Sequence, residues 1–70
     1  MLVQVIGTAI KKRRKALKIT QPYLADLAGI SVNSLYKIER GEANPTLNLV
    51  GKIADVLGLE IKLEIKKMTL

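Results

Sequence analysis

Several residue types are missing from this chain of 70 residues, and their absence narrows its chemistry. It contains no cysteine, histidine, tryptophan or phenylalanine, and its two tyrosines are the only aromatic residues. Without cysteine or histidine it forms no disulfide and offers neither thiolate nor imidazole to a metal or to catalysis. No glycine loop suited to a phosphate and no paired acids suited to a cleft are evident. We therefore expect neither an enzyme nor a cofactor.

Other absences bear on partners and location. RNA-binding proteins usually stack bases on aromatic side chains, so the two tyrosines disfavour that function. No apolar run approaches the ~20 residues of a membrane span, so no membrane partner is expected. The positive charge at residues 11–15 follows the first apolar stretch, the reverse of the order in a signal peptide. We expect a cytoplasmic protein whose small core is supported by oligomerisation.

Positive charge is concentrated in the middle of the chain. The net charge of +6 arises within residues 11–40, where eight basic residues stand against two acidic ones, whereas residues 41–70 carry four of each. The eight are Lys11, Lys12, Arg13, Arg14, Lys15, Lys18, Lys37 and Arg40. A localised basic field is what a polyanion partner requires. The alternative is a solvated basic helix face.

Apolar spacing and capping residues predict four helices. They are expected over residues 3–17, between Thr20 and Gly29, over residues 32–40, and between Thr46 and Gly58. The second and third are short and joined around Gly29, as in a helix-turn-helix, although an ordinary helical hairpin has the same pattern. Gly51 interrupts the fourth helix at a cost of ~1 kcal/mol, which we attribute to close passage of another helix.

A β-strand is predicted near the C-terminal end, where "GLEIKLEIKK" occupies residues 58–67. Apolar and charged positions alternate there, as in a half-buried strand. The apolar positions are Leu59, Ile61, Leu63 and Ile65, and the charged ones are Glu60, Lys62, Glu64 and Lys66. No second strand is evident upstream, and a lone strand leaves its backbone groups unpaired.

Antiparallel pairing with the same strand of a second copy would supply the missing neighbour. A register centred on Leu63 sets Glu60 opposite Lys66 and Lys62 opposite Glu64, so the charged pairs are of opposite sign. A register centred on Lys62 instead sets Glu60 against Glu64. Opposite-charge cross-strand pairs contribute roughly 0.2–1 kcal/mol each. We therefore predict a homodimer held by this strand, with its apolar face over the fourth helix.

The stretch "ITQPYLADLAGISVNSLYKIERGEANPT", residues 19–46, resembles the DNA-binding core of the phage-repressor-like (lambda-repressor-like) Xre family. The resemblance implies an all-α bundle of four to five short helices with a helix-turn-helix, here followed by the dimerisation strand. It divides the chain into a DNA-binding domain, residues 1–58, and a dimerisation strand and tail, residues 59–70. It implies a sequence-specific transcriptional regulator, expected to be a repressor, that binds a palindromic double-stranded DNA operator as a homodimer.

The resemblance also implies roles for single residues. Residues expected to contact bases are Val32, Asn33, Ser34 and Lys37. Residues expected to contact the DNA backbone are Gln21, Tyr23, Tyr36, Arg40, Asn44 and Arg13. The chemistry suits these roles, because asparagine can pair with adenine and lysine with guanine. The alternative for Asn33 and Lys37 is that they are ordinary exposed polar residues. Arg14 lies on the apolar stripe of the first helix, and the family pattern pairs it with Glu39.

A helix followed by a dimerising strand is also similar to the HipB-type antitoxin branch of the family. That likeness implies an alternative function, in which the protein holds a HipA-like kinase toxin and represses its own operon. A dimeric regulator without a toxin partner fits the same pattern. In either case the protein would associate with the nucleoid when it is bound to DNA.

Overall fold

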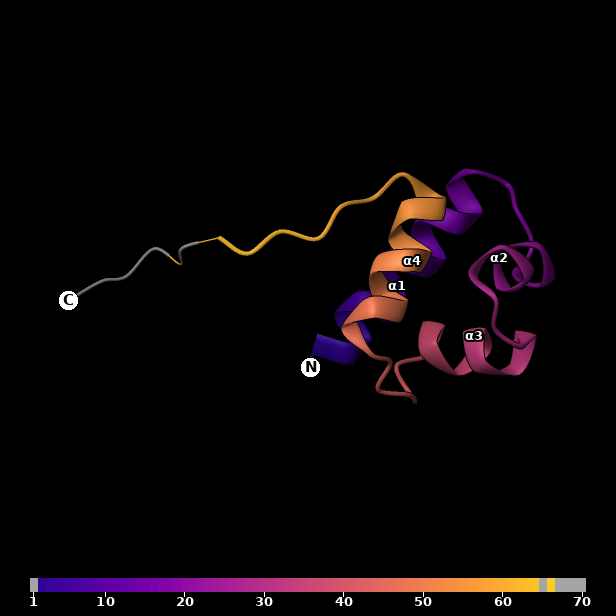
Figure 1. Cartoon of the computed structure of the whole chain (residues 1–70), viewed down its shortest axis with the longest axis horizontal. Helices are drawn as coiled ribbons and strands as arrows, with labels where there is room; N and C mark the ends of the chain where they lie inside the picture. Colours follow the sequence, from indigo (N-terminus) through magenta and orange to yellow (C-terminus); the bar gives the residue numbers. More distant parts are fainter. Residues whose placement is uncertain (1, 65, 67–70) are drawn as a thin grey trace.

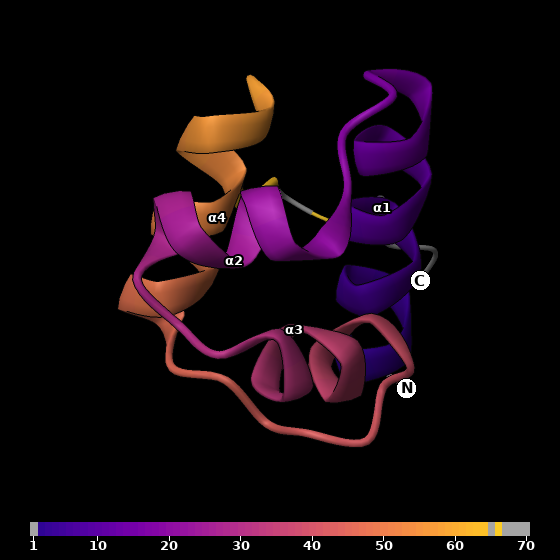
Figure 2. The same ribbon diagram turned by 90° about the vertical axis from the view of Figure 1, so that its right-hand side faces the viewer.

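Four helices make up the fold of the residues that the structure describes. The structure, a computed structural model, describes residues 2–64 and residue 66. Its helices are α1 (Leu2–Ala16), α2 (Gln21–Ala28), α3 (Val32–Glu39) and α4 (Leu47–Leu57). α1 packs beside α4, α2 packs on α4, and α3 packs on both α1 and α2 (Figures 1 and 2). The prediction of a helical bundle that contains a helix-turn-helix is therefore confirmed.

Hydroxyl and glycine caps set the ends of the shorter helices. The side chains of Thr20, Ser31 and Thr46 each accept the backbone N–H three residues further on, which satisfies a donor of the first turn. Gly29 and Gly58 end α2 and α4 in the left-handed conformation, with φ of 71° and 70°. The sequence predicts helix ends at all five of these residues, because hydroxyl side chains and the backbone freedom of glycine suit capping geometry.

One apolar core receives side chains from every helix. Leu24, Leu35, Ile53 and Leu57 are almost fully shielded from solvent. The core residues are Ile10, Leu24, Ala25, Ala28, Leu35, Ile38, Ile53 and Leu57. Burying a leucine or isoleucine side chain contributes about 1.5–3 kcal/mol, so this core fixes how α2 and α3 sit on α1 and α4.

The close helix approach occurs at Gly7 of α1 and not at Gly51 of α4. A Cβ at Gly7 would lie 2.3 Å from the carbonyl oxygen of Ile38 and 2.9 Å from that of Glu39, whereas a Cβ at Gly51 would meet nothing within 4 Å. The explanation we gave for Gly51 is therefore wrong. The end of α3 crosses α1 at Gly7, because only a residue without a side chain lets the two backbones approach so closely.

The described residues after α4 do not form the predicted strand in the single chain. Residues 59–64, here named the C-terminal arm, and residue 66 have no regular secondary structure, and the arm extends from the end of α4 toward the left of Figure 1. Leu59 packs against the core, but Leu63 is 100% exposed. Ile65 of the predicted strand lies outside the described residues. A strand needs a neighbour for its backbone hydrogen bonds, so pairing between copies stays a prediction.

The described part of the chain has no helix suited to a membrane, no cluster of metal ligands and no unpaired buried polar atom in a side chain. No helix there combines the length and the apolar character needed to cross a membrane. Within residues 2–64 and 66, no three acidic, histidine or cysteine side chains gather in a way that would hold a metal ion. In the same residues, every buried side-chain nitrogen or oxygen has a hydrogen-bond partner.

Candidate nucleic-acid interface

A tight turn joins α2 to α3. The backbone N–H of Ile30 donates to the carbonyl oxygen of Ala25 at 2.9 Å, and Gly29 supplies the left-handed residue that reverses the chain. Ala25 is 1% exposed, and its short side chain lets the two helices cross closely. α3 is thereby held across the bundle (Figure 2), and its residues divide into a buried face and an exposed face.

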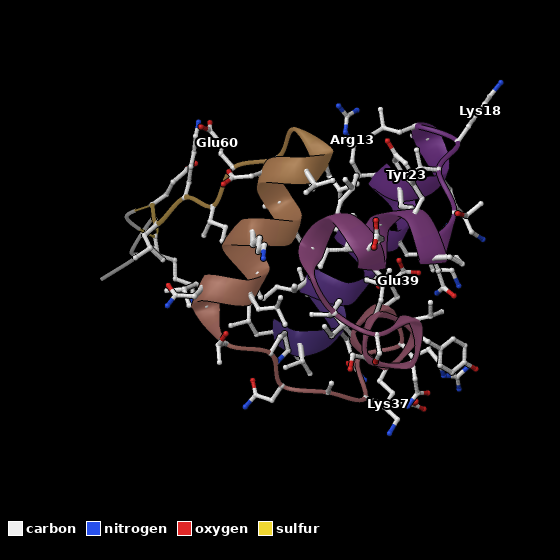
Figure 3. All side chains as sticks on the ribbon, turned by 45° about the vertical axis from the view of Figure 1, so that its right-hand side comes forward. Arg13, Lys18, Tyr23, Lys37, Glu39 and Glu60 are labelled. Carbon is white, nitrogen blue, oxygen red and sulfur yellow. The ribbon has the colours of Figure 1, made fainter. Side chains whose placement is uncertain are left out.

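The open face of α3 carries the residues predicted to contact bases. Leu35, Ile38 and Glu39 are buried. The exposed residues of this helix are Val32, Asn33, Ser34, Tyr36 and Lys37. Figure 3 shows Lys37 directed away from the body of the protein. All four candidates for base contact therefore lie on the solvent side of one short helix, within reach of an external partner.

Ser34 has part of its hydrogen-bonding capacity in use. The Oγ of Ser31 accepts the backbone N–H of Ser34 at 3.0 Å and donates to the Oγ of Ser34 at 2.9 Å. The hydroxyl hydrogen of Ser34 can still donate outward. This side chain therefore suits an external acceptor, such as a guanine or thymine oxygen, better than an external donor.

Asn44 lies beside the open face of α3, and both border a small hollow. It has a volume of about 210 Å³ and lies between α3 and the loop that leads to α4. Its lining consists of Ser34, Lys37, Ile38, Ala43, Asn44, Pro45 and Leu49. Sequence reasoning assigned Asn44 to the DNA backbone but missed this hollow, because the pattern of α3 does not show how the loop folds back against it.

Arg14 and Glu39 form a buried ion pair with two contacts. The Arg14 Nε lies 2.8 Å from Glu39 Oε2, and Arg14 Nη2 lies 3.0 Å from Oε1. Arg14 Nη1 donates to the carbonyl oxygen of Ile19 at 3.0 Å. The two side chains are 10% and 1% exposed. This is the pair expected from the family pattern, and it links α1 to the end of α3.

Gln21 joins the same network. Its Nε2 donates to Glu39 Oε1 at 3.0 Å, so one carboxylate holds both Arg14 and Gln21. The contact ties the first turn of α2 to α3. It uses one of the two amide N–H groups, and the side chain remains partly exposed, so the second N–H can donate to an outside acceptor.

Arg40 and Tyr36 form a small exposed cluster at the end of α3. The Arg40 guanidinium lies 5.3 Å from the centroid of the Tyr36 ring, and its Nε lies 3.2 Å from Oε2 of Glu42. The hydrogen bond to Glu42 and the charge of that carboxylate raise the pKa of Arg40 above its ordinary value. Glu42 was not among the predicted residues, although an acid so close to Arg40 in sequence was a signal for this contact.

Arg13 does not lie with these residues. Its Nε donates to the carbonyl oxygen of Leu57 at 2.8 Å, at the end of α4. Figure 3 shows Arg13 at the opposite end of the molecule from Lys37. The last carbonyls of a helix lack partners and carry partial negative charge, which explains this position of a guanidinium. Tyr23, in the first turn of α2, is 56% exposed.

Comparison with known proteins identifies a family whose sequence profile includes the segment of α2 and α3. The profile of a helix-turn-helix family matches residues 10–63, well over half of the chain. This chain belongs to that helix-turn-helix family. The profile covers both helices of the motif and α4, so the resemblance to phage-repressor-like proteins is confirmed at the level of the family.

Two phage repressors are relatives of this helix-turn-helix protein. It is 37% identical over 65 residues to the immunity repressor protein of Bacillus phage phi105, a match that covers 93% of this chain and 45% of the relative. It is 44% identical over 56 residues to the cryptic phage CTXphi transcriptional repressor RstR of Vibrio cholerae, covering 80% of this chain and 50% of the relative. The chain thus spans about half the length of these relatives.

Two solved structures of gene regulators share the fold. The clp gene regulator ClgR from Corynebacterium glutamicum superposes with a TM-score of 0.82 at 25% identity, covering 84% of this chain and 63% of that one. The restriction-modification controller protein C.AhdI from Aeromonas hydrophila superposes with a TM-score of 0.78 at 29% identity, covering 83% of this chain and 88% of that one. The four relatives are named as repressors, regulators or controllers, not as enzymes.

Proposed function

We propose that this protein is a sequence-specific regulator of transcription that binds double-stranded DNA as a homodimer, with repression as its effect. The observation that carries the proposal is the open face of α3, which presents Asn33 and Lys37 to solvent within a confirmed helix-turn-helix. The basic excess of residues 11–40 and the repressor names of two relatives support it. A duplex and not RNA is the expected ligand.

α3 would enter the major groove. The Asn33 amide can make two hydrogen bonds to adenine, and Lys37 can donate to N7 and O6 of guanine. Val32 can pack on a thymine methyl group, and Ser34 can donate to a base oxygen. These four side chains prefer different base edges. The bases that they contact would therefore determine most of the sequence preference within each half-site.

Phosphate contacts would surround these base contacts. The proposed residues are Gln21, Tyr23, Tyr36, Arg40 and Asn44. Gln21 is held by Glu39, which leaves its second N–H for a phosphate oxygen. Arg13 is not included, because its Nε is bonded to the carbonyl oxygen of Leu57. Such contacts set the position of the protein on the duplex without reading its sequence.

The homodimer would form through the C-terminal segment. Residues 1–58 would bind DNA, and residues 59–70 would join the copies in the antiparallel register centred on Leu63. Two copies related by a two-fold axis would place their α3 helices about one turn of DNA, ~34 Å, apart on a palindromic operator. The alternative of an antitoxin rests on the C-terminal pattern alone and stays a prediction.

Selection of bound fragments from random duplex DNA tests this function. We expect one enriched palindromic site, and we expect single-stranded RNA to compete poorly with it for the protein. Enrichment of no particular sequence would contradict sequence-specific binding. Equal competition by RNA would contradict the choice of ligand.

A further inference from the structure

An apolar groove lies on the side of the molecule away from α2 and α3. It has a volume of about 440 Å³ and opens between the first turns of α1 and α4 on one side and the C-terminal arm on the other. We name it the α1–α4 groove. Its lining consists of Leu2, Val5, Ile6, Leu47, Val50, Glu60, Ile61, Lys62 and Leu63. Figure 1 shows these helix ends and the arm on the left, with α2 and α3 on the right.

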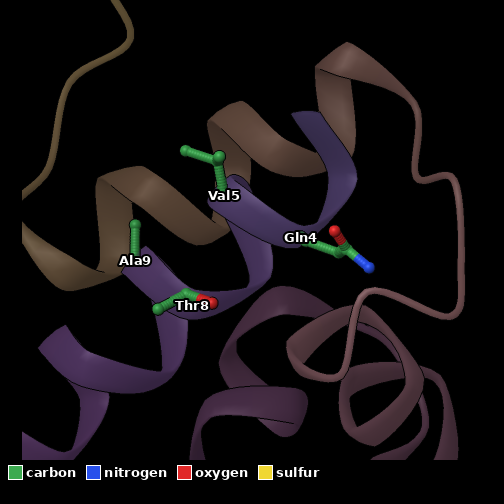
Figure 4. Close-up of a pocket in the computed structure, with 4 residues that line it drawn as sticks. All are labelled: Gln4, Val5, Thr8 and Ala9. Atoms are coloured by element: carbon green, nitrogen blue, oxygen red, sulfur yellow. The ribbon is translucent and has the colours of Figure 1, made fainter. Parts of the chain in front are cut away.

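Three of the large apolar side chains that line the groove are exposed to solvent. Leu2, Val5 and Leu47 are 72%, 63% and 73% exposed in the single chain. A shallow hollow along α1, lined by Gln4, Val5, Thr8 and Ala9, extends the same face (Figure 4). Exposed apolar side chains gathered in one place mark a surface that binds another macromolecule.

We propose that the C-terminal segment of a second copy of this chain fills the α1–α4 groove. One wall of the groove is the chain's own arm, which includes Glu60 and Lys62. A partner segment paired antiparallel with this arm would bring its Lys66 to Glu60 and its Glu64 to Lys62. This charge complementarity selects a second copy as the occupant, because the charge pattern of residues 60–66 is matched by its own reverse.

The same placement covers the apolar side chains on both copies. Ile61 and Leu63 of the arm are 48% and 100% exposed. In an antiparallel pair the apolar side chains of both strands face one side, and here that side meets Leu2, Val5 and Leu47. Because the dimer is symmetric, each copy receives the partner's segment and donates its own.

The length of the arm is sufficient. Six extended residues, 59–64, span about 20 Å at ~3.3 Å per residue. α4 has eleven residues, which correspond to about 16 Å. A partner's segment of this length is therefore long enough to cross the first turns of α1 and α4, where the groove lies.

A charge placed in the groove tests the proposal. Leu47→Glu should shift the protein from dimer to monomer in sedimentation equilibrium, with at least a tenfold rise in the dissociation constant. Leu27→Glu is the matched control, since Leu27 is 45% exposed but lies on α2. It should leave the dimer intact. Equal dimerisation of Leu47→Glu and the wild type, or a wild type that sediments as a monomer at tens of micromolar, would overturn the proposal.

Cross-linking identifies the occupant. The chain has no cysteine, so Leu47→Cys in one chain and Leu63→Cys in another each provide a single thiol. Mild oxidation of the mixture should join the two different chains. The double variant Leu47→Cys, Leu63→Cys should likewise give linked dimers. Because the register places Leu63 opposite Leu63 of the second copy, Leu63→Cys chains should also link to one another. Links only between two Leu47→Cys chains would show a different dimer and overturn the proposal.

The proposal rests on the homodimer of the proposed function but not on its DNA contacts. Lys37→Ala should dimerise as the wild type does, whatever its effect on DNA. If the dimer forms as described and no DNA sequence is selected, the result contradicts the proposed function but not the groove proposal. If a DNA sequence is selected and Leu47→Glu still dimerises as the wild type does, the result contradicts the groove proposal but not the proposed function.

Discussion

At the scale of residues, the ion pair between Arg14 and Glu39 leads to a prediction about stability. Glu39→Ala leaves the Arg14 guanidinium without its counter-ion where that side chain is 10% exposed, and it removes the acceptor of Gln21. Loss of one partner of a buried pair costs about 3–5 kcal/mol. We expect chemical denaturation to show a loss of this size in the free energy of unfolding.

The matched control removes both charges. Arg14→Met combined with Glu39→Leu leaves no buried charge without a partner, so the double variant should lose less free energy of unfolding than Glu39→Ala alone. An unchanged free energy of unfolding in Glu39→Ala would show that the pair contributes nothing to stability.

Glu42 leads to a second prediction at this scale, this time about binding. Its carboxylate neutralises Arg40, which is one of the proposed phosphate contacts. Glu42→Gln should free that guanidinium and remove a negative charge near the DNA. We expect duplex affinity to rise by roughly two- to fivefold, the equivalent of one exposed ion pair.

Because Arg40 would contact phosphate, the gain from Glu42→Gln should be similar for every sequence. Fluorescence anisotropy with the selected site and with an unrelated duplex measures both affinities. A change in sequence preference, or a loss of affinity, would remove Arg40 from the set of phosphate contacts.

Single residues also show where sequence reasoning succeeded and where it failed. Arg14 was unusual on an apolar stripe, and the family pattern supplied Glu39 as its partner. Arg13 stood in a run of basic residues that gave no hint of its acceptor, the Leu57 carbonyl, which lies 44 residues away along the chain. Contacts between distant helices depend on packing angles, and the local spacing of apolar residues does not encode them.

At the scale of elements, two glycines in helices should respond in opposite ways to alanine. Gly51→Ala should raise the free energy of unfolding by about 1 kcal/mol, because alanine favours the helix and the added methyl group meets no neighbour. Gly7→Ala should lower it by about 1–3 kcal/mol, because the methyl group would overlap the carbonyl oxygen of Ile38. Thermal denaturation followed by circular dichroism measures both changes, and a more stable Gly7→Ala variant would contradict this account of the α1–α3 crossing.

The elements themselves were largely predictable from the sequence. Thr20, Gly29, Thr46 and Gly58 marked helix ends because their side chains or backbone freedom suit capping. The strand was different. Its pattern is as regular as that of any helix, but a strand needs a neighbour, and residues 2–64 and 66 of the single chain supply none. We therefore propose that the alternating sequence pattern at residues 59–66 specifies pairing between two copies of the chain.

At the scale of the whole molecule, the proposed DNA surface and the α1–α4 groove lie on different sides. Figure 1 places α3 on the right and the C-terminal arm on the left, so two copies joined at the arm can both keep α3 free for one duplex. A dimer with about six to ten phosphate contacts should show a log–log slope of about −5 to −9 for affinity against salt concentration. A slope near zero would contradict binding through the phosphate backbone.

The central claim is that α3 reads DNA sequence while its neighbours hold the phosphates. The most direct measurement compares alanine variants of the two proposed groups on the selected operator and on every single-base change of it. Asn33→Ala and Lys37→Ala should each lose about 1–3 kcal/mol of discrimination at particular positions. Gln21→Ala should weaken all sequences to a similar extent. The account is contradicted if Asn33→Ala and Lys37→Ala scale all affinities uniformly while Gln21→Ala changes the preferred sequence.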